Sequence, residues 1–391
     1  MSSPSDPVSA FSLVSGGPLY RLARIAGLTD GAPGLIRIGL ALSFLTWLPL
    51  AVLTLIPYAP AAEPSLPFML SAGTHVRLLV AIPLLFAAEA VFDVRVREAL
   101  RLIVETRVVS AHQRSRFNGW LQQAMALRDA WYVELAVLLL AIVMVAWGFR
   151  QDLSSAIPGW RTTTGGVRTA AGWWYGCVAI PVFQFLFLRW AARMLIWWYL
   201  LWRIGQLDLH LTPTHPDSAG GLGVLGVAQT ALLPITFSYT GILAGTFAEE
   251  MLYGGAQIAD YVLPLTGIIA AGAVMLCAPL LRFAPRLIDV RQRGLLEYGA
   301  LATTYVRAFD DKWLRQGATS AEPLLGSADI QSLADLTSSC EVIAQMRPVP
   351  LSMRQALSIL IITALPAAPL VLFVAPFDEL ILRGLRTLLH V

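Results

Sequence analysis

Long apolar stretches separated by shorter polar segments dominate this sequence. A membrane-spanning helix needs roughly 20 consecutive, mostly apolar residues, and seven stretches reach about this length. They are Leu35–Pro57, Val76–Val94, Trp131–Phe149, Gly172–Ile204, Leu222–Ala248, Tyr261–Phe283 and Ala356–Pro376. Inside hydrocarbon a helix satisfies its own backbone hydrogen bonds. The pattern therefore predicts an all-α fold: a polytopic helical membrane bundle with six or seven transmembrane helices and cytoplasmic helical extensions.

Composition agrees with this prediction and narrows the expected partners. The 391 residues are 57% hydrophobic and 14% charged, whereas soluble domains carry about 25% charged residues. The formal net charge of +3 is small for this length, so we expect the lipid bilayer and a small solute or ion as partners, and no nucleic acid. The three cysteines are far apart in sequence, which argues against a disulfide framework. No cofactor is expected.

The distribution of basic residues predicts the topology. Cytoplasmic loops of membrane proteins are enriched in Lys and Arg. Arginines are numerous after the second and sixth stretches and absent from loops 58–75 and 249–260, whereas loop 150–171 carries three. This pattern predicts a multi-pass protein of the bacterial inner membrane with a cytoplasmic N-terminus.

The last apolar stretch leaves the number of crossings open. It contains Pro366, Pro369 and Pro376, and proline kinks or breaks a helix. Residues 356–376 either cross fully or dip in and return, which would reverse the side of the C-terminus. We therefore divide the chain into an N-terminal interfacial segment (1–34), a six-span bundle (35–289), a cytoplasmic helical region (290–353) and a final part (354–391) that ends in an amphipathic tail.

The cytoplasmic region contains a heptad-like apolar stripe along residues 288–309. Its members, spaced by three, four or seven residues, are Ile288, Leu295, Tyr298, Ala302, Tyr305 and Phe309. Such spacing is typical of a helix packed against another helix. The partner is either an extension of the second spanning helix in the same chain or a second copy, which would give a homo-oligomer through this stripe.

Charged residues inside apolar stretches are the first candidates for function. Glu89 and Asp93 are four residues apart in the second stretch, and Arg189 and Arg193 are four apart in the fourth. Residues at this spacing share one helix face, so the pairs are predicted to form an ion-pair ladder. Charges within spans are costly and usually face a partner or a cavity. The ladder either fixes helix packing or, together with Arg282, lines a hydrated pathway.

A second candidate is the polar loop that follows the fourth stretch. It contains Asp208, His210, His215 and Asp217, followed by Gly220, Gly221 and Gly223. Three interpretations stay open. Asp217 can cap the next helix in a structural turn. The exposed N–H groups of the glycine run can bind an anion or another ligand. The imidazoles and carboxylates can hold a metal ion, although their spacing fits no zinc pattern.

Prolines and glycines interrupt the fifth and sixth stretches. Pro234, Gly241 and Gly245 lie in the fifth, and Pro264 and Pro279 lie in the sixth. Broken helices expose helix ends to substrate in many transporters, whereas a Gly-x-x-x-Gly pattern is equally typical of close helix packing. Both interpretations stay open.

Three segments carry a resemblance to known proteins. They are 326–336, the Met-Arg-Pro-Val-Pro run at 346–350 and the His-Pro-Asp-Ser-Ala-Gly-Gly-Leu-Gly run at 215–223. They resemble bacterial polytopic membrane proteins with an HPDxxGGLG loop. The resemblance implies the multi-pass fold and carries no activity to this chain.

Buried charges, interrupted spans and the absence of phosphate-loop, nucleophile-elbow or dinucleotide motifs favour transport over catalysis. We expect a channel or transporter for an ion or a small solute, and the arginines at membrane depth favour an anionic one. The alternatives are a membrane enzyme that acts on a lipid-linked substrate through the His/Asp loop, with catalytic residues undefined, and a membrane sensor or scaffold.

Overall fold

The computed structural model describes residues 7–16, 31–55, 67–153, 159–162, 167–315 and 328–373. Helices account for nearly all regular structure in these ranges, which contain only isolated β-bridges besides. The first half contains α2 (Gly31–Leu53), α3 (Ala72–His75), η2 (Val76–Ala81), α4 (Ile82–Glu105), α5 (Arg114–Asp129) and α6 (Trp131–Leu153). The middle contains α7 (Ala170–Trp174), η4 (Tyr175–Ala179), α8 (Ile180–Ile204), α9 (Gly223–Thr230) and α10 (Leu233–Tyr253). The last part contains α11 (Ile258–Cys277), η5 (Ala278–Phe283), α12 (Ala284–Asp310), η6 (Asp311–Arg315), α13 (Ala328–Ala344), α14 (Met353–Ala364) and η7 (Leu365–Phe373).

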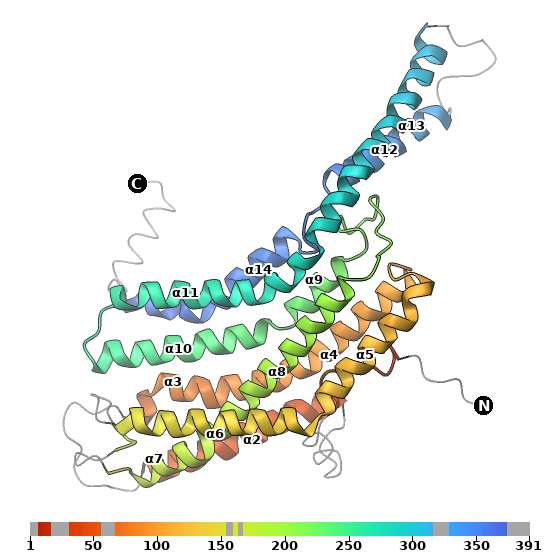
Figure 1. The fold of residues 1–391 in the computed structure, drawn as a ribbon. Coiled ribbons are helices and arrows are strands. Elements are labelled where there is room, and N and C mark those ends of the chain that lie inside the picture. The colour runs from red at the N-terminus through yellow and green to blue at the C-terminus, as the bar shows by residue number, and fades with distance from the viewer. Residues whose placement is uncertain are drawn as a thin grey trace, which may run out of the picture.

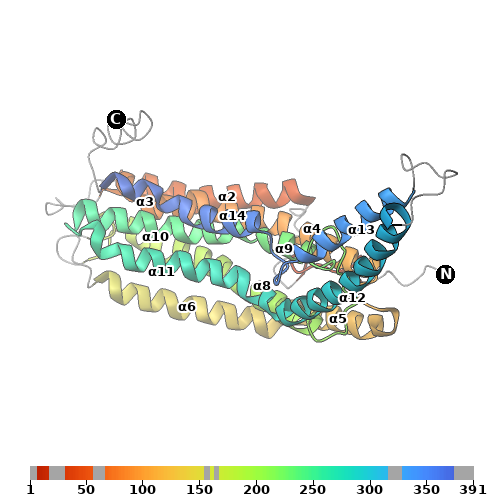
Figure 2. The same ribbon diagram turned by 90° about the horizontal axis from the view of Figure 1, so that it is seen from above.

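The long apolar helices run side by side in one bundle, and the α12–α13 pair projects away from it (Figure 1). A view from above gives the same arrangement (Figure 2). We call the end of the bundle near α3 and α7 the α7 end, and the opposite end the α5 end. Helix α10 lies inside the bundle and packs on α3, η2, α4, α11 and α14, whereas α6 packs on α8 at its edge.

Six helices in the described ranges are long and apolar enough to cross a membrane. They are Pro33–Leu53, Trp131–Gly148, Ala170–Ile204, Gly223–Tyr253, Ile258–Arg315 and Met353–Val371. The predicted all-α bundle is therefore confirmed. The predicted second stretch, Val76–Val94, is helical but does not meet these criteria. It lies within the continuous run η2–α4, which carries the charged residues Arg77, Glu89 and Asp93.

Several helices change their winding inside the bundle. The runs η2 and η4 are π-helical, and each directly precedes a helix with proline in its first turn, Pro83 in α4 and Pro181 in α8. Proline cannot donate the regular backbone hydrogen bond, and its missing bond accounts for the π-helical winding of the turn before it. Pro279 marks the 3₁₀ segment η5 in the same way. Single-turn π-bulges occur frequently at functional sites.

The last apolar stretch runs on without turning back over its described part. Helix α14 continues into the 3₁₀ segment η7, which contains Pro366 and Pro369, and the two follow one course beside α11 (Figures 1 and 2). The prolines therefore tighten the helix rather than reverse it as far as Phe373. The predicted amphipathic tail and Pro376 lie outside the described residues.

The stripe on α12 packs against α13, not against the second spanning helix. The Tyr305 hydroxyl donates to the Asp329 carbonyl at 3.1 Å, and Cys340 lies 3.9 Å from the Tyr298 carbonyl. The interpretation of a partner in the second helix is therefore wrong, because the helix after the loop returns along α12. Within this chain α13 half-covers the tyrosines on which the predicted homo-oligomer depends, and the homo-oligomer stays a prediction.

The Gly241-x-x-x-Gly245 pattern is a close-packing face. A Cβ atom on Gly245 would lie only 2.7 Å from the Gly73 nitrogen and 2.8 Å from its Cα. One turn further on, the buried carboxylate of Glu249 accepts hydrogen bonds from the Gly73 N–H at 2.6 Å and the Ser71 hydroxyl at 3.2 Å. Small residues and one carboxylate thus fix the start of α3 against α10.

We predict that Gly245→Ala destabilises the bundle by about 1–3 kcal/mol, because the added methyl group overpacks a backbone contact. The matched control is Gly267→Ala in α11, where a Cβ atom would meet nothing within 4 Å. That change should leave stability equal or raise it by about 0.5–1 kcal/mol through helix propensity. Thermal unfolding in mild detergent measures both. Equal effects of the two substitutions would contradict the packing role.

Candidate functional site

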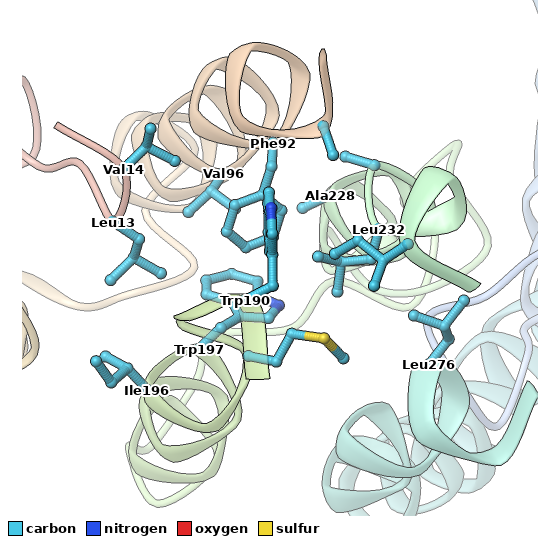
Figure 3. Packing of buried hydrophobic residues seen from close by; sticks show 14 of the residues in the cluster. Leu13, Val14, Phe92, Val96, Trp190, Ile196, Trp197, Ala228, Leu232 and Leu276 are labelled. Carbon is cyan, nitrogen blue, oxygen red and sulfur yellow. The ribbon is translucent and has the colours of Figure 1, made fainter. Parts of the chain in front are cut away.

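The centre of the α5 half of the bundle is a tight aromatic layer. Phe92, Trp190 and Trp197 are at most 1% exposed, and their rings meet edge to face with centroids 5.7 and 6.0 Å apart. Figure 3 shows them between α4, α8 and the α9–α10 region, with Leu13 of the N-terminal segment at the side. The two indole N–H groups donate to the Leu85 carbonyl and the Gln229 side chain. The rings and their hydrogen bonds pack α4 and α8 closely against each other and against α9.

Beside this layer lies a buried ion pair. The Arg193 guanidinium donates to the Glu89 carboxylate, and the two side chains are 5% and 4% exposed. The guanidinium of Arg189, one turn earlier, lies 3.8 Å from the same carboxylate. A cavity of about 30 Å³ touches Arg189, Arg193 and Glu134, which is room for about one water molecule. The predicted contact between the second and fourth stretches is therefore present, and it is closely packed.

The predicted ladder is incomplete, because Asp93 does not reach either arginine of α8. Its carboxylate instead pairs with Arg97, one turn along α4, and accepts a hydrogen bond from the Ser12 hydroxyl at 2.5 Å. Arg282 is also apart from the pair. It is exposed and lies against Gly205 at the end of α8. The predicted pairing of Asp93 with Arg189 or Arg193 is thus replaced by its contacts with Arg97 and with Ser12 of the N-terminal segment.

The N-terminal segment 7–16 folds into the bundle, whereas residues 17–30 of the predicted interfacial segment (1–34) lie outside the described residues. Phe11 and Leu13 are each 1% exposed. Three arginines from three helices donate to its carbonyl groups: Arg97 to Phe11 at 3.1 Å, Arg128 to Ser12, and Arg193 to Val14 at 3.4 Å. No pattern in the sequence indicates this burial, because a short stretch with few charges has neither a helical nor a spanning pattern.

The polar loop 208–223 is organised around the carboxylate of Asp217. It accepts hydrogen bonds from the N–H groups of Ala219 at 2.8 Å, Gly221 at 3.1 Å and Gly223 at 2.8 Å. Burial opposes ionisation of this carboxyl group, but these N–H donors and the neighbouring His215 hold its pKa below the ordinary value. The chain's own carboxylate thus fills the position at the start of α9 that we considered for an external anion, as the capping interpretation predicts.

The glycines of this loop are required by backbone conformation. Gly220 has φ +63° and Gly221 has φ +96°, a region that L-residues avoid. The loop also meets the 346–350 run: the Arg347 N–H donates to the Ser218 carbonyl at 2.8 Å, and its guanidinium reaches the Asp217 carbonyl. Segments 215–223 and 346–350 therefore pack on each other and connect the α12–α13 pair to the bundle.

The remaining loop candidates do not assemble into a metal centre. Asp208 and His210 are exposed, whereas His215 lies 2.8 Å from Asp217. No group of three His, Cys, Asp or Glu side chains that could hold a metal ion occurs within the described ranges. The metal interpretation therefore has no geometric support from that part of the chain.

A further candidate site was not predicted from the sequence. It is a cavity of about 420 Å³ towards the α7 end, lined by Arg77, Arg161, Tyr175, Gln184, residues of α6 and an aromatic wall from α8 and α10. The Arg77 guanidinium donates to the Tyr175 hydroxyl and lies 5.8 Å from the Phe183 ring centroid. Arg161 lies 4.8 Å from the Tyr175 ring centroid. We call this cavity the arginine pocket.

The two π-helical runs supply both sides of the arginine pocket. Arg77 is in η2, and Tyr175 and Gly176 are in η4. No carboxylate in the described ranges pairs with Arg77, whose contacts are the Tyr175 hydroxyl and the Phe183 ring. A lone arginine inside an apolar stretch is the sequence signal that was missed. Its importance depends on Tyr175, almost 100 residues away in sequence, and no local pattern connects the two.

Fold and geometry define the class of this molecule: it is a multi-pass helical membrane protein whose helices contact the lipid bilayer. Comparison with family models, curated proteins and solved structures gave no match. The function must therefore be inferred from the buried ion pair and the arginine pocket.

We predict that Glu89→Gln lowers the free energy of unfolding by about 3–5 kcal/mol, because it leaves the buried Arg193 without its partner charge. The control is Glu98→Gln on the same helix, which breaks an exposed pair with Arg95 and should cost less than about 1 kcal/mol. Thermal unfolding in detergent checks both. Similar small shifts for the two variants would show that the buried pair contributes little.

A second prediction concerns Asp217 and pH. The pKa of its carboxyl group is below the ordinary 3.8 in the folded protein, so ionisation adds stability above pH 3.8 that is lost as the pH falls through the lowered folded value. Asp217→Asn should therefore cost about 1.5–3 kcal/mol at pH 7, and less and less as the pH falls below 3.8. The exposed Asp208→Asn is the control in thermal unfolding from pH 7 to pH 3. A penalty that is the same at every pH would contradict the role of the charge.

Proposed function

We propose that this protein transports a small solute that carries a negative charge, and that the arginine pocket is its binding site in the conformation described here. The observation that carries the proposal is the pocket itself. It is an aromatic-walled cavity of about 420 Å³ among membrane-spanning helices, with a guanidinium that no described carboxylate neutralises. Ligand sites typically have about 300–1,000 Å³ and a few convergent polar groups in a largely apolar wall.

The position of the pocket supports transport over simple binding. It lies towards the α7 end of η2–α4 and η4–α8, and the same two runs carry the Glu89–Arg193 pair and the Phe92–Trp190 contact further towards the α5 end. An open cavity on one side of a closed layer is the arrangement that alternating access requires. We infer that the ion pair and the aromatic layer form the closed gate.

Charge placement suggests which side is open. The α5 end contains the arginine-rich turns around α5 and the start of α12, and such residues favour the cytoplasm. In this proposal the arginine pocket faces the outside of a bacterial inner membrane and the gate faces the cytoplasm, in agreement with a cytoplasmic N-terminus.

The gate has a physical reason to move as a unit. Separating Glu89 from Arg189 and Arg193 inside the bundle leaves buried charges unpaired, unless water or a ligand replaces the lost partners. The segment 7–16 adds hydrogen bonds to Arg193 and Asp93, so opening towards the α5 end requires this segment to shift. In this scheme the residues we expected to line the pathway, Glu89, Arg189 and Arg193, act as its gate, and the pathway role of Arg282 stays a prediction.

The alternative of a lipid-directed enzyme depended on the His/Asp loop. Its Asp217 is engaged with three backbone N–H groups, and Asp208 and His210 are exposed at a distance from the arginine pocket's lining. No described feature favours this alternative, or the sensor or scaffold alternative, over transport.

Flux into proteoliposomes tests the proposal. We predict protein-dependent counterflow of labelled inorganic phosphate, or of hexanesulfonate as a permanently charged apolar anion, and a loss of at least tenfold in rate for Arg77→Gln. The matched control is Arg101→Gln, an exposed arginine on α4 paired with Glu105, which should transport at the unaltered rate.

Two results would contradict the transport proposal. One is no flux of either anion above protein-free vesicles while the purified protein is folded. The other is equal rates for Arg77→Gln and the unaltered protein, which would place any transport path outside the arginine pocket.

A further inference from the structure

The arginine pocket has different chemistry at its two ends. Arg77 lies about five residues from the start of α3, which places it roughly 8 Å from the α7 end of that helix, and Arg161 belongs to the neighbouring loop. Tyr239 lines the pocket from α10, where its ring stacks on Phe187. The pocket is thus cationic around Arg77 and Arg161 and apolar along the rings of Phe183, Phe187 and Tyr239.

The apolar part of the pocket is a continuous aromatic wall. The rings of Phe183 and Phe187 stack with centroids 6.0 Å apart, and Phe187 stacks on Tyr239 at 5.6 Å. Ile242 and Leu243 extend this wall along α10, and Met144 faces it from α6. Such a surface binds methylene groups well and offers almost nothing to a small hydrated anion.

The pocket also reaches the outside of the bundle beside Tyr239. Tyr239 lines it and is 43% exposed. The adjoining face of α6 is apolar and exposed along its length, including Leu139, Ile142 and Val143. In the middle of a spanning helix, such surface faces lipid hydrocarbon rather than water. A ligand can therefore enter sideways from the bilayer between α6 and α10.

From this polarity we propose that the ligand of the arginine pocket is an anionic amphiphile of the membrane: a lipid whose phosphate or other anionic head pairs with Arg77 and whose chain lies against Phe183, Phe187 and Tyr239. This inference rests on the proposed function only because it names the class of substrate for the same pocket. Binding can be measured without transport.

The chemistry of Arg77 selects an acidic head. Its guanidinium donates to the Tyr175 hydroxyl and contacts the Phe183 ring, which leaves donor N–H groups of its fork available for oxygen atoms of a phosphate. The π-helical runs bring Arg77 and Tyr175 together in the pocket lining. A zwitterionic head would bring a cation next to these arginines and should bind less well.

Binding to the delipidated full-length protein in detergent tests this inference by calorimetry or native mass spectrometry. The probes are dioctanoyl phosphatidylglycerol, dioctanoyl phosphatidylcholine and inorganic phosphate. We expect the phosphatidylglycerol to bind at least tenfold more tightly than either the phosphatidylcholine or inorganic phosphate.

Variants separate the head from the chain. Arg77→Gln should weaken phosphatidylglycerol binding at least tenfold and bring it close to that of phosphatidylcholine. Leu243→Trp should fill the apolar part and weaken binding of both lipids. The matched controls are Arg101→Gln and Leu252→Trp; Leu252 is exposed on the same helix and does not line the pocket. Both controls should bind as the unaltered protein does.

Each contrary outcome has a separate meaning. Equal binding of both lipids, or no lipid binding by a folded protein, would overturn the inference. Saturable phosphate binding lost in Arg77→Gln, without lipid preference, would also overturn the amphiphile assignment, and the transport of a small anion would survive. Specific lipid binding without any flux of anions or of labelled phosphatidylglycerol would support the ligand class and contradict transport.

Discussion

The Glu89–Arg193 pair is the interaction on which the α5 half of the bundle depends. Both side chains are almost fully buried, and an unpaired charge at this depth costs several kcal/mol. The pair therefore fixes α4 and α8 in one register. The aromatic layer of Phe92, Trp190 and Trp197 packs beside it. The N-terminal segment is bound through its carbonyl groups to Arg97, Arg128 and Arg193, which also pair with acidic residues.

The same two helical runs behave differently towards the α7 end. There η2 and η4 are widened to π-helix, and the space between helices becomes the arginine pocket instead of a packed core. In the proposed transport mechanism, a closely packed half and an open half on the same helices would allow two conformations, with the ion pair closing one end. Loop 208–223, built on Asp217, joins the ends of α8 and α9 to the α12–α13 pair.

Sequence reasoning recovered the parts of this molecule that depend on local composition. Apolar length predicted the helices. The packing face at Gly241 and Gly245 and the capped turn at Asp217 were each one of the interpretations that the sequence left open. The contact between Glu89 and Arg193 was predicted because four-residue spacing puts charges on one helix face. Asp93 was misassigned because Ser12 and Arg97 compete for its carboxylate, and nothing in the sequence reports which partner is nearer.

What the sequence did not predict depends on distant segments meeting. The arginine pocket needs Arg77 and Tyr175 to face each other, and the burial of segment 7–16 needs arginines from three helices. The α12 stripe was recognised, but its partner was α13 rather than the second helix, since a stripe records that a helix packs and not what it packs against. Tertiary contacts of this kind have no local pattern.

The central claim is that one end of the path is open and the Glu89–Arg193 pair closes the other. It is tested most directly by thiol labelling in sealed vesicles, after Cys177, Cys277 and Cys340 are replaced by serine. A membrane-impermeant reagent added from the α7 side should label Gln184→Cys in the pocket and leave Ala192→Cys, beside the ion pair, unlabelled. Adding Glu89→Gln should make Ala192→Cys reactive. Equal labelling of both positions in the unaltered background, or no effect of Glu89→Gln, would contradict the account.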